Sequence, residues 1–239
     1  MNRFVIDGIK RHLLRDQIRE HLLERIGNGS LAPGTRIVEA RVCEELGVSS
    51  IPVREAILEL VVTGVLASAT HKGAWVREVS LDETVEALHV KAALEALAAR
   101  LAMPKLKDHC AGLRQIYGDL VQAARRKDFV AYQRCNQAFH RHIVEAAGNA
   151  VLLRTWSSLA FEVRTRFIMD FAATGDAVGI ARDHEPIIEA FRAGDAERAA
   201  ELLATHATHL GVFLLRQGAA PKTVSRAARS TGPGRRKSK

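Results

Sequence analysis

Residues 46–56 read LGVSSIPVREA, and this stretch decides the fold of the N-terminal third of the chain. From residue 53 onward the apolar side chains recur three and four positions apart, which predicts a helix over residues 50–63 with one buried face. Gly47 separates this helix from a short helical piece over residues 39–46. Two short helices joined by a tight glycine turn are typical of a helix-turn-helix.

The outward face at the start of the helix predicted over residues 50–63 suits contact with DNA. Its buried stripe would hold the helix rigid, while Ser50 and Ile51 face away from the core toward a major groove. Ser49 or Ser50 can cap the helix, and Pro52 is tolerated in the first turn. The helix start is therefore also a candidate seat for a phosphate group.

Arg54 lies one turn into the same helix and is the candidate base-reading residue. Arginine can donate two parallel hydrogen bonds to O6 and N7 of guanine, which is worth roughly 1–3 kcal/mol of discrimination. The alternative is a surface arginine paired with Glu55 or Glu59.

The segments on either side complete a winged helix-turn-helix. A helical stripe over residues 13–26 ends at the sequence Gly-Asn-Gly of residues 27–29. After the helix-turn-helix, residues 65–69 and 74–79 are short apolar segments on either side of a polar turn, which predicts a small hairpin, the wing. We expect a DNA-binding domain over residues 1–78.

Residues 79–217 give no further strand signal, so the chain is predicted to be mainly α-helical. Breaks near residues 104, 126–128, 148–149, 174–176 and 194–195 divide this region into about six helices. Asp195 is placed to cap the last helix. Short connections favour an antiparallel bundle.

Charge is unevenly distributed along the chain. The formal net charge is +8, and residues 218–239 carry seven Lys and Arg residues and no acidic residue. This tail has few large apolar residues and is expected to be disordered, either as a solubilising end or as an extra DNA-contacting arm. The three cysteines are far apart and indicate no disulfide framework. No apolar run approaches the ~20 residues of a membrane span, so a cytoplasmic protein is expected.

Four residues of the helical region form a candidate metal site. Asn136 and His140 lie four positions apart and so project from one helix face, while His184 and His206 lie next to apolar core positions. Three neutral imidazoles and an amide oxygen suit a divalent transition metal such as zinc or nickel. Taken alone, each histidine could equally be a structural residue of the core.

The N-terminal third resembles the GntR family of winged helix-turn-helix regulators. The resemblance rests on residues 33–37 (PGTRI), Glu39, residues 46–56 and residues 64–66 (GVL). It implies that Arg54 contacts a base, that residues 49–52 sit on phosphate, and that the wing tip enters the minor groove. It also places the remaining DNA-contacting candidates at Arg36, Arg41, Lys72 and Gly73. Ser50 stands where the family usually has an arginine that reads DNA, so one contact is missing or shortened.

The helical region resembles the FCD effector domain of the FadR subfamily. The resemblance rests on residues 136–140 (NQAFH), on His184 with the apolar residues after it, and on residues 194–196 (GDA) leading to His206. In the metal-binding members an Asp or Asn and three histidines hold the ion, which carries over to Asn136, His140, His184 and His206. An amide in place of a carboxylate makes the site one negative charge poorer.

The effector implied by this resemblance is a small organic acid that completes the metal's coordination. Arg164 and Arg166 are candidate cationic clamps, as is Lys91, which stands where the subfamily commonly has arginine. For all three, the alternative is an ordinary surface cation.

The expected protein is a homodimeric repressor rather than an enzyme. Two recognition helices one turn of DNA apart would match a palindromic double-stranded operator. Two other functions stay open: a metalloenzyme in the helical domain, for which Glu185 is the arguable general base, and an architectural DNA binder without sequence preference.

Overall fold

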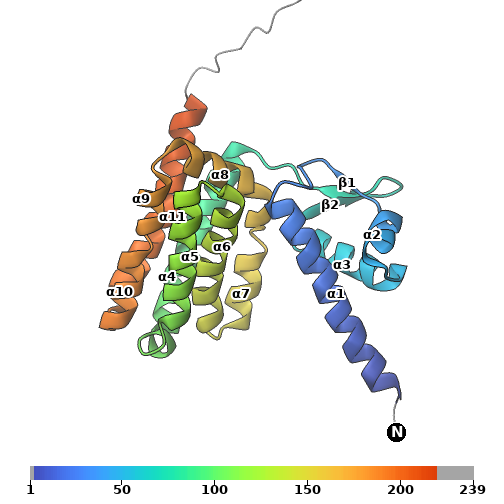
Figure 1. The fold of residues 1–239 in the computed structure, drawn as a ribbon, viewed down its shortest axis with the longest axis horizontal. Helices are drawn as coiled ribbons and strands as arrows, with labels where there is room; N and C mark the ends of the chain where they lie inside the picture. The colour runs from blue at the N-terminus through green and yellow to red at the C-terminus, as the bar shows by residue number, and fades with distance from the viewer. Residues whose placement is uncertain (1–2, 220–239) are drawn as a thin grey trace, which may run out of the picture.

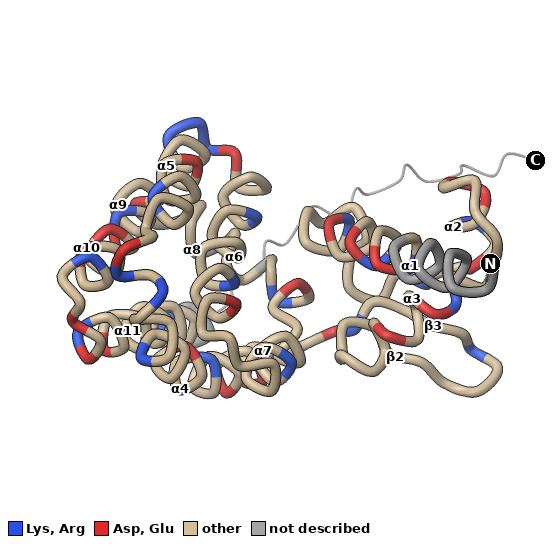
Figure 2. Tube along the Cα trace, turned by 90° about the horizontal axis from the view of Figure 1, so that it is seen from below, with Lys and Arg blue, Asp and Glu red and all other residues tan. Residues whose placement is uncertain are grey.

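The computed structural model describes the backbone of residues 3–219 and the side chains of residues 14–216 other than 166, 170, 171 and 174. The described chain forms two lobes of unequal size, a small mixed lobe followed by a larger helical one (Figure 1). Acidic and basic residues are interspersed over both lobes (Figure 2). No helix of the described part is both long enough and apolar enough to cross a bilayer.

The small lobe is a winged helix-turn-helix. Its elements are α1 (Arg3–Gly27), β1 (Arg36–Ile37), α2 (Glu39–Leu46), α3 (Ser50–Val62), β2 (Leu66–Ala69) and β3 (Gly73–Val76). β3 lies between β1 and β2 and is antiparallel to both, with Arg36 opposite Trp75 and Leu66 opposite Val76. Gly47 ends α2 at φ +64°, a conformation that side chains with a Cβ atom avoid.

One apolar core holds the small lobe together. The predicted buried stripe of α3 packs against α1, β2 and β3, and Val53 and Ala56 are fully buried. Members of this cluster from the other elements include Ile18, Leu22, Ile26, Val65, Leu66 and Val76. The helix-turn-helix and the hairpin are as the sequence predicts, while α1 begins at Arg3 instead of residue 13 and β1 is an additional strand.

The large lobe is entirely helical. Its elements are α4 (Leu81–Leu106), α5 (Ala111–Arg126), α6 (Phe129–Ala146), α7 (Ala150–Ser157), the 3₁₀ turn η1 (Phe161–Arg164), α8 (Thr165–Thr174), α9 (Ala177–Arg182), α10 (Glu185–Ala193) and α11 (Ala196–Ala219). α4 and α11 lie side by side (Figure 1). Asp195 caps α11 as predicted, since its Oδ1 accepts a hydrogen bond of 2.9 Å from the Arg198 backbone.

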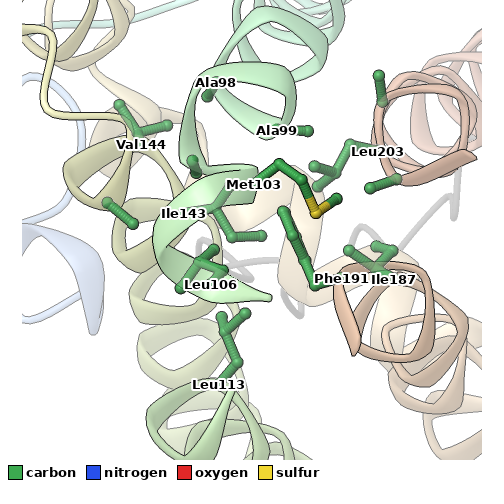
Figure 3. Close-up of a cluster of buried hydrophobic side chains, with 14 of the residues drawn as sticks. Ala98, Ala99, Met103, Leu106, Leu113, Ile143, Val144, Ile187, Phe191 and Leu203 are labelled. Carbon is green, nitrogen blue, oxygen red and sulfur yellow. The ribbon is translucent and has the colours of Figure 1, made fainter. Parts of the chain in front are cut away.

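The core of the large lobe depends on small side chains along α4. Ala98, Ala99 and Ala102 are fully buried, so the neighbouring helices can approach α4 closely. Figure 3 shows Leu203 of α11 and Phe191 of α10 filling the space beside Ala99 and Met103.

The described part of the large lobe contains eight α-helices instead of about six. The expected break at Pro104 does not occur, and α4 continues to Leu106. Pro104 lies in the last turn, where it removes only one backbone hydrogen bond, and burial of Leu106 stabilises the end of the helix. Residues 150–173 are interrupted at Ala160, which adopts φ +49°. Residues 177–193 divide into α9 and α10, because Pro186 is best accommodated in the first turn of a helix and so favours a new helix start there.

Candidate functional site

The exposed face of α3 carries the predicted DNA-contacting residues. Ser50, Ile51 and Arg54 are exposed, and the Arg54 side chain keeps 64% of its surface accessible. Pro52 is buried, so its place is in the packing of the first turn. Ser49 occupies the N-cap position, but its hydroxyl makes no capping hydrogen bond to the helix.

Arg54 is held by Glu39 of α2. Its Nε and Nη2 donate hydrogen bonds of 3.1 and 2.8 Å to the two carboxylate oxygens of Glu39. Its partner is therefore neither Glu55 nor Glu59, and Glu59 is bound instead by Arg19 of α1 at 2.5 Å. These two parallel hydrogen bonds fix the orientation of the Arg54 guanidinium, although the side chain is exposed to solvent.

The other predicted DNA-contacting residues lie on β1, α2 and the wing. Arg36, Arg41, Lys72 and Gly73 are all exposed. The Arg36 guanidinium lies so close to Gly73 that a Cβ atom there would stand 3.5 Å from Nε and Nη2. The structure thus brings Arg36 beside the wing tip, whereas Arg41 stands apart on α2.

Three predicted metal-ligating histidines converge inside the large lobe. His140 comes from α6, His184 from the start of α10 and His206 from α11, and one ring nitrogen of each lies within 4.8 Å of the others. His184 is fully buried, and its ring centroid is 4.3 Å from that of His206. Burial, together with the neighbouring His140, lowers the pKa of His184 to about 3. The imidazoles are therefore neutral, as metal ligands must be.

The hydrogen bonds of His184 test whether the site fits a cation. Nδ1 lies 3.0 Å from the carbonyl oxygen of Ala181, and Nε2 lies 3.1 Å from Oδ1 of Asn136. A neutral imidazole carries one proton, so in either tautomer one of these contacts would place two acceptors face to face. Two arrangements remove the conflict: the Asn136 amide turned to present its NH₂ group, or a cation bound by both acceptors. The donor set of three imidazoles and one amide oxygen fits zinc or nickel.

Glu95 of α4 supports this cluster from behind. Its side chain is 1% exposed, and its Oε2 lies 3.0 Å from Nδ1 of His140, although the contact does not have hydrogen-bond geometry. Its Oε1 accepts a hydrogen bond of 2.9 Å from the Trp156 indole and lies 2.7 Å from Nζ of Lys91. Burial alone would raise the pKa of Glu95, but a protonated His140 and the ammonium group of Lys91 lower it, so the carboxylate is ionised. With the carboxylate on its Nδ1 side, the His140 ring has Nε2 left for a metal.

A cavity of about 80 Å³ opens beside the histidines. Its wall includes His140, His206, Lys91, Phe161 and Asp183. One water molecule occupies about 10–15 Å³ of such a cavity volume, so the cavity has room for a ligand of a few heavy atoms. Lys91 is the candidate effector clamp that faces this space.

Comparison with known proteins places the chain in a family. Residues 14–76 match the gntR family of bacterial regulatory proteins, and residues 86–209 match the FCD domain. A protein of Paenarthrobacter nicotinovorans, named "Probable D-xylose utilization operon transcriptional repressor", is 35% identical over 200 residues, which cover 83% of this chain and 87% of that protein. The chain belongs to the GntR family. This GntR regulator is therefore a DNA-binding transcription regulator with a C-terminal FCD domain, not an enzyme.

Solved structures and further relatives agree with this assignment. The structure of McbR (YncC) from E. coli matches the GntR regulator with a TM-score of 0.74 at 25% sequence identity, over 86% of this chain and 98% of McbR. The transcriptional repressor RspR of Escherichia coli is 24% identical over 194 residues, which cover 81% of this chain and 85% of RspR.

Two predicted effector clamps of the GntR regulator need a different description. The structure places Arg164 outside the cavity wall, 3% exposed and bound to Glu83 and to backbone carbonyl groups. An arginine with these partners supports the junction of the lobes instead of facing a ligand. Arg166 lies in α8, and its side chain is outside the described part of the chain.

The role of Glu95 in this GntR regulator was not predicted from the sequence. The available signal was its spacing of four residues from Lys91, which places opposite charges on one helix face. Glu95 also interrupts an otherwise alanine-rich buried stripe of α4, where an unpaired carboxylate would be costly.

Proposed function

We propose that this GntR regulator is a repressor that binds a palindromic operator as a homodimer and is released by a small organic acid bound beside a divalent metal. Residues 1–78 would bind DNA and residues 79–217 would bind the effector and dimerise. The predicted tail over residues 218–239 lies, from residue 220 onward, outside the described residues. Repression is supported by the names of two relatives, and cytoplasmic action follows from an operator on bacterial DNA.

The observation that carries the effector part of this proposal is the convergence of three neutral histidines and Asn136 at the wall of a small cavity. His140, His184, His206 and Asn136 would hold the metal. When bound, a zinc or nickel ion supplies open coordination positions that carboxylate oxygens can fill. Lys91 faces the same cavity and supplies N–H donors to a bound acid.

A thermal-shift experiment tests the effector class. We expect at least one small carboxylic acid to raise the melting temperature of zinc-loaded protein, because a ligand of the native state at 100 times its Kd adds about 2.7 kcal/mol. For a chain of this size the shift is roughly 5–10 °C. The amide of the same acid is the matched control and should produce no shift. A panel in which acids and amides behave alike would reject an acidic effector.

The homodimer is supported by an exposed apolar stripe on α4. Val90, Leu97 and Leu101 lie on one face of this helix and are 42–47% exposed. The opposite face of α4 is buried in the core of the large lobe, so these three side chains form the solvent-facing side of the helix. A second copy of the same face would bury it across a two-fold axis, as a symmetric dimer requires.

Replacement of Arg54 by alanine is expected to weaken operator binding by about 1–3 kcal/mol, roughly 5- to 150-fold, and to reduce discrimination at one base pair in each half-site. Arg41→Ala is the matched control, because loss of a phosphate contact weakens binding to all sequences alike and lowers the salt dependence. Fluorescence anisotropy with the palindrome, a single half-site and a scrambled duplex measures these effects. Sedimentation of the palindrome complex should give two protomers per duplex. Unchanged selectivity in Arg54→Ala would reject the assigned reading helix.

A further inference from the structure

The segment over residues 159–164 belongs to both lobes. Ala160 and Val163 are 1% and 3% exposed and lie in the apolar core of the DNA-binding lobe, together with Ile18 and Leu22 of α1. Phe161 is also buried, but it packs with residues of α4, α8 and α11 and lines the cavity beside the histidines. A segment from the second half of the chain therefore completes the core of the first.

The 3₁₀ geometry of η1 explains this division. In a 3₁₀ helix residues three positions apart lie on the same side. Phe161 and Arg164 therefore share one side of η1, while Val163 lies on another side and, with Ala160 before the turn, packs into the core of the DNA-binding lobe. A movement of Phe161 must consequently move Val163, since one short turn carries both.

Arg164 connects η1 to the two segments that join the lobes. Its Nη2 donates a hydrogen bond of 2.9 Å to Oε1 of Glu83, in the first turn of α4. The same oxygen accepts a hydrogen bond of 2.7 Å from Nη2 of Arg77, which directly follows the wing strand β3. Arg164 Nη1 also donates to the carbonyl oxygens of Leu159 and Ala160. One carboxylate thus holds together the end of the wing, the start of α4 and η1.

Phe161 links this junction to the cavity. Nζ of Lys91 lies 5.5 Å from the centroid of the Phe161 ring, and the guanidinium carbon of Arg164 lies 5.6 Å from it. Both cations are within the range of a cation–π contact. The contacts therefore run without a gap from Glu95 behind the metal site through Lys91 and Phe161 to Arg164.

Ala160 holds this turn in a conformation that alanine rarely adopts. Its φ of +49° places an alanine in the left-handed region, at a cost of about 1–2 kcal/mol relative to the right-handed helix. Such a residue is retained only when its surroundings hold it.

We propose that the segment over residues 159–164 transmits occupancy of the metal and effector cavity to the DNA-binding lobe, with Phe161 as the contact to the cavity and the Arg164–Glu83–Arg77 cluster as the contact to the wing. This inference rests on the proposed function, because it requires a ligand site at the histidines. It assigns Arg164 and Glu83 a positioning role and explains why Arg164 binds Glu83 and does not line the cavity.

Hydrogen exchange of the DNA-binding lobe tests this link, with zinc as the probe. In the full-length protein zinc is expected to slow amide exchange in residues 18–26 and 65–79 by at least about fivefold, the lower limit of usual coupling between sites. Glu83→Gln should bind zinc as the wild type does, measured by calorimetry, but lose this slowing. Phe161→Leu should also lose the slowing at a zinc concentration that saturates its site. Glu197→Gln removes an arginine pair elsewhere, with Arg100, and Phe191→Leu removes a buried ring elsewhere; both should respond as the wild type does.

The possible outcomes separate the link from the site. If zinc binds but exchange in the DNA-binding lobe does not change, or if Glu83→Gln responds as the wild type does, the link is rejected and the metal site stands. If zinc binds to no form of the protein, the metal site and the link are rejected together. Glu83→Gln keeps the test decisive even if Phe161→Leu does not fold.

Discussion

Replacement of His184 by alanine is expected to abolish measurable zinc binding. His184 is fully buried, and its Nε2 lies 3.1 Å from the Asn136 oxygen, so its removal takes away a central ligand and leaves a void that is closed to solvent. Loss of a partner behind a ligand already costs 10- to 100-fold in metal affinity, so loss of the ligand itself should exceed about 100-fold. Calorimetry and elemental analysis of the purified protein measure this loss.

His142→Ala is the matched control for His184→Ala. His142 lies on α6 like His140, but it packs against Gly112 and not against the cavity. Its replacement should leave zinc affinity unchanged. Asn136→Asp should raise zinc affinity above that of the wild type, because the added negative charge strengthens cation binding. Equal zinc affinity in His184→Ala and in the wild type would show that the histidine cluster is structural.

Replacement of Glu95 by alanine is expected to destabilise the fold by about 3–5 kcal/mol, the usual cost of removing one partner of a buried ion pair. The change leaves the ammonium group of Lys91 without its partner at 2.7 Å and the Trp156 indole without its acceptor. Domains are stable by about 5–15 kcal/mol, so this is a large fraction of the total. Urea denaturation at a fixed protein concentration measures it.

The double variant Lys91→Met with Glu95→Leu separates pairing from packing. Both charges are removed and apolar volume is kept, so the double variant should be more stable than Glu95→Ala alone. A double variant that is as unstable as the sum of its single changes would show that Lys91 and Glu95 act independently. Such additivity would also contradict the view that Glu95 is held ionised by its neighbours.

The sequence predicted the DNA-binding lobe well because its signals are local. The stripe from Val53 to Leu60, the glycine at residue 47 and the polar turn before Gly73 each specify a structure within a few residues. The alternative for Arg54, an ion pair with Glu55 or Glu59, named the wrong partner, because Glu39 lies on another helix and spacing along α3 does not report it. The strand β1 was missed because two residues carry no periodicity.

The helical lobe was predicted in class but not in detail. The extra break at Ala160 could not be foreseen, since alanine is the strongest helix former and its left-handed conformation is imposed by contacts of both lobes. Glycine, which marks such positions in other sequences, is absent at this position. Pro186 indicates the break at residue 183, because proline favours the first turn of a helix.

The four residues of the candidate metal site were predicted from the sequence, whereas the residues that surround them were not. Asn136 and His140 are four positions apart, so their proximity is a property of one helix. The contacts of Glu95 with Trp156 and of Arg164 with Glu83 join residues 61 and 81 positions apart. Contacts of this separation depend on how helices pack, and a single sequence contains no periodicity that reports it.

The fork between Arg54 and Glu39 has a consequence for how the regulator searches a genome. Glu39 occupies the Nε and Nη2 donors of Arg54. If Arg54 reads a guanine as proposed, the free protein carries an internal competitor for that base. A duplex with the correct base would replace both hydrogen bonds of Arg54 to Glu39. A duplex with another base would separate Arg54 from Glu39 without supplying equivalent hydrogen bonds. On this proposal the carboxylate would shorten the time that the protein spends on wrong sites, without itself contacting the DNA.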